Sequence, residues 1–312
     1  MKCKDLRDAV VEYASKNTVT ECAELFEGIV SLNTVYKWLR DSKNLTYAYT
    51  HDQCRHELEL YKLREAKYTC SIGMNRLVHT FQPHFFDVER ELWQDKIIQQ
   101  KLKENRRKYL NKDTLTDREI LRGFKISGIH TGYSHFSPLW LKKYAHEEDV
   151  SCIYDPCGGW GHRLIGAYLS DIDYIYNDMW DKTFMGSNTI AKFINYKCTL
   201  YNNDCTKFIP QETYDCVFTC PPYYNVERYN GKLFKDIEDY NRFINAMLVN
   251  SIKPSVTRVG IVINDTYEQA VSDNMDSSFK LASRVVLGTS AAVSHFNKST
   301  SSKKEVLLKY QR

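Results

Sequence analysis

The sequence lacks the patterns that mark membrane, secreted and zinc-binding proteins. No run of apolar residues approaches the roughly 18 that suggest a membrane-spanning helix, and the first residues form no apolar leader. The chain has 10 cysteines, but no two of them form a Cys-x-x-Cys pair, which argues against a zinc knuckle and a redox motif. We therefore expect a cytoplasmic protein with reduced thiols, without a metal and without a membrane partner.

The chain also lacks a large excess of charge of either sign. Its 43 basic and 39 acidic residues leave a net charge of +4, which permits a nucleic acid partner without demanding one. Basic residues gather locally, however, because residues 101–112 include Arg106, Arg107 and four lysines against the single Glu104. A solvated helix face and a surface that contacts phosphates would both show this pattern.

Residues 1 to about 125 have the periodic polar stretches of helices and few β-branched runs. Three short helices with a turn at Gly28 are expected within the first forty residues, and the second begins with a capping-box pattern at residues 18–21. This arrangement resembles a helix-turn-helix, although an ordinary three-helix cap without DNA contact fits the same residues. In the DNA-binding interpretation, the last helix presents to a major groove the side chains of Asn33, Thr34, Lys37 and Arg40.

From about residue 150 onward, short apolar runs alternate mostly with helical stretches. The runs predict strands at residues 152–154, 174–176, 198–201, 216–219, 259–263, 284–287 and 305–309. Strands separated by helices indicate βαβ units and a largely parallel sheet. A Ser/Lys-rich turn at residues 298–304 is placed to close an antiparallel hairpin between the last two strands.

A glycine-rich segment directly follows the first predicted strand and opens a helix. It reads Asp155, Pro156, Cys157, Gly158, Gly159, Trp160, Gly161. Small residues let the backbone approach a ligand beside the start of a helix. The next two strands end at Asp178 and Asp204, at the edge of the sheet where open α/β sheets bind ligands, and an acidic residue at the first of these positions suits ribose hydroxyls.

The pattern Asp-Pro-x-x-Gly-x-Gly resembles motif I of the class I S-adenosylmethionine-dependent methyltransferases. The resemblance implies that the loop wraps the methionine part of S-adenosylmethionine, with Asp178 at the ribose hydroxyls and Asp204 near the adenine. The loop residues implied in binding are Asp155, Pro156, Gly158, Gly159 and Gly161. A glycine turn that only packs a helix is the alternative, and an NAD site fits the glycine spacing less well.

The fourth predicted strand runs straight into two prolines and two tyrosines, in the order Cys220, Pro221, Pro222, Tyr223, Tyr224. Because prolines do not continue a sheet, the chain must leave the strand at its carboxyl edge. The carbonyl of residue 220 or 221 is then available to an amino group, and Tyr223 can offer a flat face to a base. Such acceptors would orient an exocyclic amine for in-line methyl transfer, after the base has been flipped out of a duplex.

This turn resembles the (Asp/Asn/Ser)-Pro-Pro-Tyr signature of the DNA methyltransferases that act on N6 of adenine or N4 of cytosine, which implies that Cys220, Pro221, Pro222 and Tyr223 form the catalytic centre. The segment that begins at His135 is similar to the family's motif X and implies that the cofactor pocket is completed by Phe136, Ser137 and Pro138. Together with the last predicted strand, the resemblance covers roughly residues 130–312.

The resemblance implies an α/β fold with a Rossmann-like sheet of seven strands, mostly parallel with an antiparallel last strand. We therefore expect a methyltransferase domain at residues 126–312 and a helical, DNA-binding or target-recognition region at residues 1–125. Residues 225–231 are expected to form a loop over the target base, where Arg228 would fill the vacated space or touch the flipped nucleotide. An ordinary surface loop is the alternative there.

Cys220 departs from the family signature, because a thiol is a weaker acceptor than a carboxylate or amide oxygen. Its likeness in shape to serine favours N4 of cytosine over N6 of adenine. A third option makes Cys220 a nucleophile that attacks C6 of a pyrimidine for C5 methylation, although the C5 enzymes place their cysteine after the proline. RNA or a protein amide as acceptor, and a DNA-binding protein with an inactive methyltransferase fold, are the remaining alternatives.

Overall fold

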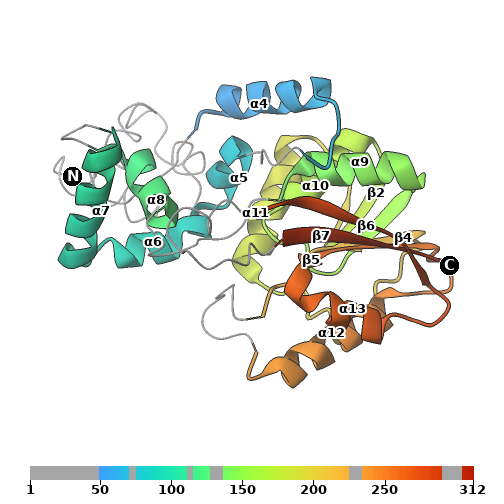
Figure 1. Ribbon diagram of the computed structural model, residues 1–312. Helices are drawn as coiled ribbons and strands as arrows, with labels where there is room; N and C mark the ends of the chain where they lie inside the picture. The colour runs from blue at the N-terminus through green and yellow to red at the C-terminus, as the bar shows by residue number, and fades with distance from the viewer. Residues whose placement is uncertain (1–48, 70–74, 111–114, 127–135, 225–233, 290–303) are drawn as a thin grey trace. The chain divides into compact units, whose positions relative to one another are not determined.

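The computed structural model describes residues 49–69, 75–110, 115–126, 136–224, 234–289 and 304–312 (Figure 1). Several predicted features lie outside these residues, namely the helix-turn-helix with Asn33, Thr34, Lys37 and Arg40, the loop residue Arg228, and most of the turn at 298–304. Among the described helices, none is both long enough and apolar enough to cross a membrane.

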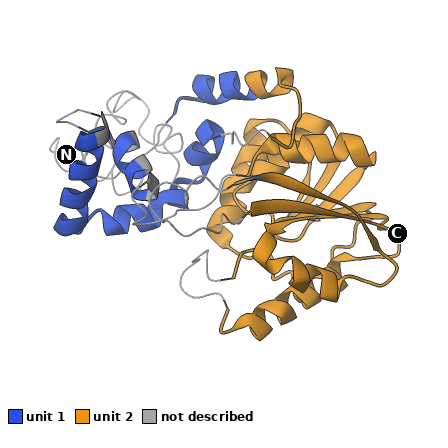
Figure 2. Cartoon of the chain, in the orientation of Figure 1, with its two compact units in different colours: residues 1–58, 75–134, 292–298 blue, residues 59–74, 135–291, 299–312 orange. Residues whose placement is uncertain are grey.

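The chain forms two compact units (Figure 2). The first comprises residues 1–58, 75–134 and 292–298, and the second comprises residues 59–74, 135–291 and 299–312. All strands that the structure describes belong to the second unit. Our division of the chain into domains after residue 125 stays a prediction.

The second unit is built on one sheet of seven strands. They are β1 (Cys152–Asp155), β2 (Asp173–Asn177), β3 (Thr199–Tyr201), β4 (Cys216–Thr219), β5 (Arg258–Asn264), β6 (Lys280–Thr289) and β7 (Lys304–Gln311). Their order is β3-β2-β1-β4-β5-β7-β6, in which the first five pair in parallel and β7 runs antiparallel to both of its neighbours. The predicted strands and the predicted α/β, Rossmann-like fold are therefore confirmed.

Helices cover both faces of this sheet, as the apolar side chains on its two faces require. Figure 1 shows α9 (Pro138–Glu148) and α10 (His162–Ser170) on one side of the sheet, with α12 (Ile237–Ser251) and α13 (Glu268–Asn274) on the other. The next helix, α11 (Asp181–Phe193), packs against α10 and β3. All four residues of β4 are buried, so the strand before the proline pair lies in the centre of the core.

The described part of residues 49–126 forms helices, as expected. These are α4 (His51–Leu63), α5 (Asn75–Phe81), the 3-10 helix η1 (Pro83–Phe86), α6 (Asp87–Leu92), α7 (Lys96–Leu110) and α8 (Asp117–Ile126). The predicted phosphate-contacting surface falls on α7 and needs one correction. Arg106 is only 6% exposed, because its side chain packs against Gly123 of α8, which offers no side chain of its own. Arg107, the next residue, is exposed.

Candidate active site

The glycine-rich loop between β1 and α10 has a backbone that its glycines make possible. Gly161 has φ 88° at the start of α10, in the left-handed region that glycine enters without strain. Gly158 is required for a different reason, namely space. A Cβ on Gly158 would lie 2.1 Å from the ring of Tyr176, which extends from β2 beneath the loop. The packing of the loop onto β2 therefore excludes any side chain at residue 158.

Hydrogen bonds from β2 hold this loop in place. The Tyr176 hydroxyl donates to the carbonyl of Gly159 at 2.7 Å, and the amide of Gly158 donates to the carbonyl of Asn177 at 2.7 Å. The buried side chain of Asn177 donates to the carbonyl of Pro156 and also exchanges hydrogen bonds with the backbone of Asn203, after β3. Asn177 thus joins the loops that follow β1 and β3. Asn177, the neighbour of the predicted ribose-binding Asp178, was not identified from the sequence.

Asp178 lies at the end of β2 next to the loop, where the sequence predicts it. One carboxylate oxygen accepts from the amide of Gly159 at 2.8 Å and the other from the amide of Trp180 at 2.9 Å. Burial raises the pKa of Asp178 to about 6, although these two hydrogen bonds act to lower the pKa. Asp204 lies in the loop that begins after β3, where it accepts hydrogen bonds from Thr206 and pairs with Lys207 at 3.0 Å.

The Asp155 side chain lies in the protein interior, whereas the sequence suggests that it faces a ligand. Its side chain is fully buried, and its carboxylate accepts from Arg163 Nε at 2.6 Å, from the Tyr174 hydroxyl at 2.5 Å and from Thr219 Oγ1 at 2.7 Å. The expectation that Asp155 itself touches a ligand is corrected, because these partners enclose it. Sequence reasoning did not identify Arg163, whose only early signal is a cation directly before the apolar residues 164–165.

The Arg163 guanidinium is held from several sides. It also donates to the carbonyl of Cys157 in the loop, and its guanidinium carbon lies 5.3 Å from the centre of the Phe136 ring. Burial opposes the charge, but the neighbouring Asp155 carboxylate holds the pKa of Arg163 above its ordinary value. Burial, together with the same carboxylate, raises the pKa of Tyr174, which keeps its hydroxyl a donor. The network therefore contains one paired anion and cation and two neutral donors.

The residues of the predicted motif X pack beneath this network. Phe136 is buried and contacts Trp140 and Phe218 edge to face, with ring centres 5.2 and 6.1 Å away. Ser137 is buried at the N-cap of α9, and Pro138 is the first residue of that helix. They lie in the same unit as the glycine-rich loop, with Phe136 beside Arg163.

The Cys-Pro-Pro-Tyr turn leaves β4 next to the glycine-rich loop. The residue before it, Thr219, is the one bonded to Asp155, and β4 pairs directly with β1. Among the residues that the structure describes, none donates a hydrogen bond to the carbonyl of Pro221. The carbonyl of Tyr224 is held by the hydroxyl of Tyr267 at 2.8 Å. The backbone of the turn is thus held at Tyr224, and the role of the Pro221 carbonyl as an acceptor for an amine stays a prediction.

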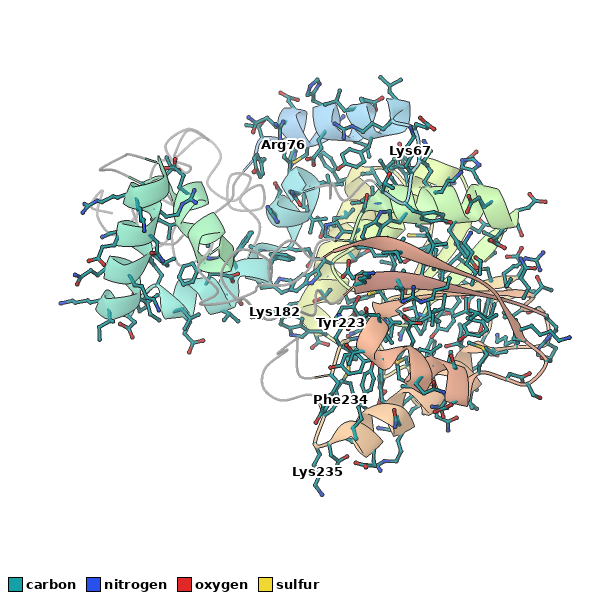
Figure 3. All side chains as sticks on the ribbon, in the orientation of Figure 1. Lys67, Arg76, Lys182, Tyr223, Phe234 and Lys235 are labelled. Atoms are coloured by element: carbon teal, nitrogen blue, oxygen red, sulfur yellow. The ribbon has the colours of Figure 1, made fainter. Side chains whose placement is uncertain are left out.

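The ring of Tyr223 is buried, so its face is not exposed for a base to stack on it. It is 5% exposed and lies at the edge of the sheet where β5 ends and β7 begins (Figure 3). Its hydroxyl is 3.5 Å from Cys220 Sγ and donates to Glu305 of β7 at 3.3 Å. The groups that cover its ring would have to move before a base could stack on it. Glu305 was not identified from the sequence, because only the sheet order brings β7 to this turn.

The thiols near the loop are free. Cys157 Sγ lies 3.8 Å from Cys205 Sγ and 3.7 Å from Met247 Sδ. Across the described ranges, no group of three or more His, Cys, Asp or Glu side chains is arranged to hold a metal ion.

Neither a protein-family model nor a curated protein matches the sequence. Solved structures with a similar fold include TrmN from Thermus thermophilus, at 13% identity and a TM-score of 0.41 over 56% of this chain and 48% of that one. An S-adenosylmethionine-dependent methyltransferase from Clostridium acetobutylicum has 8% identity and a TM-score of 0.39, over 54% of this chain and 87% of that one.

A third similar structure is an O-methyltransferase from Brevibacillus brevis in complex with S-adenosyl-L-homocysteine. It has 9% identity and a TM-score of 0.39, and the match covers 56% of this chain and 72% of that one. The match to TrmN spans about half the length of that protein.

Proposed function

We propose that this protein transfers a methyl group from S-adenosylmethionine to the exocyclic amino group of a base in DNA. One observation carries the proposal. The hydrogen bond from Thr219 to Asp155 ties the end of β4 to the end of β1, so the Cys-Pro-Pro-Tyr turn and the glycine-rich loop leave adjacent strands together. Both leave at the carboxyl edge of a parallel sheet, where ligands of such folds bind.

The residues at this edge fit the proposed cofactor. S-adenosylmethionine supplies an activated methyl group when bound. The missing side chains of Gly158 and Gly161 let the loop pack directly on Tyr176, Ser187 and Ile190, and small residues of this kind let a backbone approach a ligand closely. A carboxylate has about four lone-pair sites, and backbone amides occupy only one on each oxygen of Asp178, so ribose hydroxyls can still donate to it.

The other proposed cofactor residues would contact the cofactor at the edge of its pocket or support the side chains that form the pocket. Asp204 would contact the adenine, and Phe136, Ser137 and Pro138 would support the pocket from the start of α9. Asp155 acts through Arg163, which it holds against the loop carbonyl of Cys157.

The turn would prepare the acceptor amine chiefly by orientation. The carbonyl of Pro221 can accept a hydrogen from the amine, so that the nitrogen lone pair points at the methyl carbon. A flipped base would enter beside Tyr223. Basic residues of α7 that are exposed, Lys101, Lys103, Arg107 and Lys108, could contact phosphates. Asn33, Thr34, Lys37, Arg40 and Arg228 stay proposed DNA contacts that lie outside the described residues.

Transfer of radiolabelled methyl from S-adenosylmethionine is the direct test. We expect the purified protein to label mixed-sequence DNA, single- or double-stranded, and Tyr223→Ala to slow the labelling about 100-fold because the base loses its positioning. Mixed RNA and protein serve as parallel acceptors. Labelling of RNA or protein alone would replace DNA as the substrate, and labelling of none would refute the proposal. A covalent adduct trapped on a 5-fluoropyrimidine would instead identify Cys220 as a nucleophile.

Binding of the cofactor should depend on pH through Asp178. With a pKa of about 6, the carboxylate that the ribose hydroxyls need is lost below that pH, so the Kd for S-adenosylhomocysteine should rise about 10-fold at pH 5. The weaker binding at pH 5 would not result from a less stable fold through Asp178. A pKa above the unfolded value means that protonation of Asp178 favours the fold as the pH falls through 6. Calorimetric titration measures the Kd, and the control is the same titration of Asp178→Asn. Because this variant has no carboxylate at residue 178, it should bind S-adenosylhomocysteine weakly at every pH, without a change in Kd near pH 6.

A further inference from the structure

Glu305 reaches the proposed catalytic turn from a distant part of the sequence. It is the second residue of β7, which lies antiparallel between β5 and β6. In this register Glu305 pairs with Asn264, the last residue of β5. Since β4 runs parallel to β5, Glu305 stands at the same edge at which the Cys-Pro-Pro-Tyr turn leaves the sheet. Its Oε1 accepts a hydrogen bond from the Tyr223 hydroxyl at 3.3 Å.

The same hydroxyl also meets the residue at which this chain departs from the family signature. Cys220 Sγ lies 3.5 Å from the Tyr223 hydroxyl. Sulfur is a weak hydrogen-bond acceptor, whereas a carboxylate forms short, charge-assisted hydrogen bonds. The Tyr223 hydroxyl therefore contacts both a weak hydrogen-bond acceptor, Cys220 Sγ, and a strong one, the Glu305 carboxylate.

The backbone around these groups is held in place. The hydroxyl of Tyr267, in the 3-10 helix η2 (Asp265–Tyr267) that follows β5, donates to the carbonyl of Tyr224. This bond fastens the end of the turn to the end of β5, the strand whose last residue pairs with Glu305. The distance between the turn and the carboxylate is thus set by the sheet itself.

We propose that Glu305 is the catalytic carboxylate that accepts a hydrogen from the target amine, in place of the Asp, Asn or Ser that the similar signature carries where this chain has Cys220. The proposal rests on the amino-methyl transfer proposed above. In the transfer, the lone pair of the amine nitrogen forms the new bond to the methyl carbon. The bond between that carbon and sulfur breaks, and its electron pair stays on sulfur. The nitrogen then carries an extra proton, which Glu305 takes and passes to water.

The test compares rates of single-turnover methyl transfer to mixed-sequence DNA. Glu305→Gln should slow transfer about 100-fold, the usual size of a proton-accepting contribution, while its Kd for S-adenosylhomocysteine stays unchanged. Adding Cys220→Asp to this variant should recover at least about tenfold of the rate, because a carboxylate returns to the site. Glu268→Gln, at a glutamate of α13 that pairs with Arg284, is the matched control and should keep the wild-type rate.

A purely structural role of Glu305 predicts a different pattern. If Glu305 only holds the Tyr223 hydroxyl, Glu305→Gln will cause no further loss in a Tyr223→Phe background, and that result would overturn the proposal. An unchanged rate in Glu305→Gln would overturn it as well. Should that variant fail to bind S-adenosylhomocysteine, Glu305→Asp and Glu305→Ala take its place: the carboxylate of Glu305→Asp should keep the rate well above that of Glu305→Ala, and equal rates in these two variants would contradict the role. Failure of the wild-type protein to label any acceptor would instead refute the proposed function.

Discussion

Replacing Arg163 with methionine is expected to lower the free energy of unfolding by about 3–5 kcal/mol. The Arg163 side chain is almost fully buried, and it faces the fully buried Asp155 carboxylate at 2.6 Å. Without the guanidinium, that carboxylate keeps its two hydroxyl donors, Tyr174 and Thr219, but has no opposite charge. Burying an unpaired charge is far more expensive than losing an exposed ion pair. Urea unfolding at neutral pH measures the difference.

Two further variants make this result specific. Arg242→Met removes an ion pair with Asp239 whose arginine is 68% exposed, so it should change the stability by less than about 1 kcal/mol. Combining Arg163→Met with Asp155→Asn removes both charges and should regain much of the lost stability. A loss in Arg163→Met no larger than that in Arg242→Met would show that Asp155 and Arg163 are not paired in a dry interior.

Gly158→Ala is expected to raise the Kd for S-adenosylhomocysteine by about 100-fold. The new Cβ would lie 2.1–2.7 Å from atoms of the Tyr176 ring, and this ring is fixed by its hydrogen bond to Gly159. Relief requires the loop to move away from β2, and overpacking of this kind costs roughly 1–3 kcal/mol, which corresponds to as much as about 100-fold in affinity. Isothermal titration calorimetry measures the change directly.

Gly159→Ala provides the comparison within the same loop. A Cβ on Gly159 would meet its nearest heavy atom only at 3.7 Å, although its φ of 59° makes the residue strained. We expect about a tenfold weaker affinity there, since the left-handed conformation costs about 1–2 kcal/mol. Wild-type affinity in Gly158→Ala would contradict the close packing of loop and ring, and the proposed cofactor site would lose its main steric support.

Much of the fold follows from local sequence patterns. Each of the seven strands forms where an apolar run predicts it, and the glycine-rich loop and the Cys-Pro-Pro-Tyr turn directly follow β1 and β4. These features are readable because their causes act over a few residues. Glycine permits a left-handed φ, proline ends a ladder, and alternation of apolar runs with helical stretches favours parallel strands.

The site contains contacts that no local pattern encodes. Arg106 belongs to a basic run that looks solvated, yet it is buried because Gly123 of the next helix leaves room for it. Asp155 reads as a ligand-binding residue, but Arg163, Tyr174 and Thr219 enclose it from three different elements. In each case the outcome depends on which side chains another element brings close.

The sequence by itself therefore determined the strands, the glycine-rich loop and the turn at Cys220, because the conformations of glycine and proline and the burial of apolar runs are local properties. Only the tertiary structure decided which groups complete the turn. The insertion of β7 between β5 and β6 brings Glu305 to Tyr223 across 82 residues of sequence. Such a contact depends on the order of strands in the finished sheet, and the spacing of residues along the chain does not specify that order.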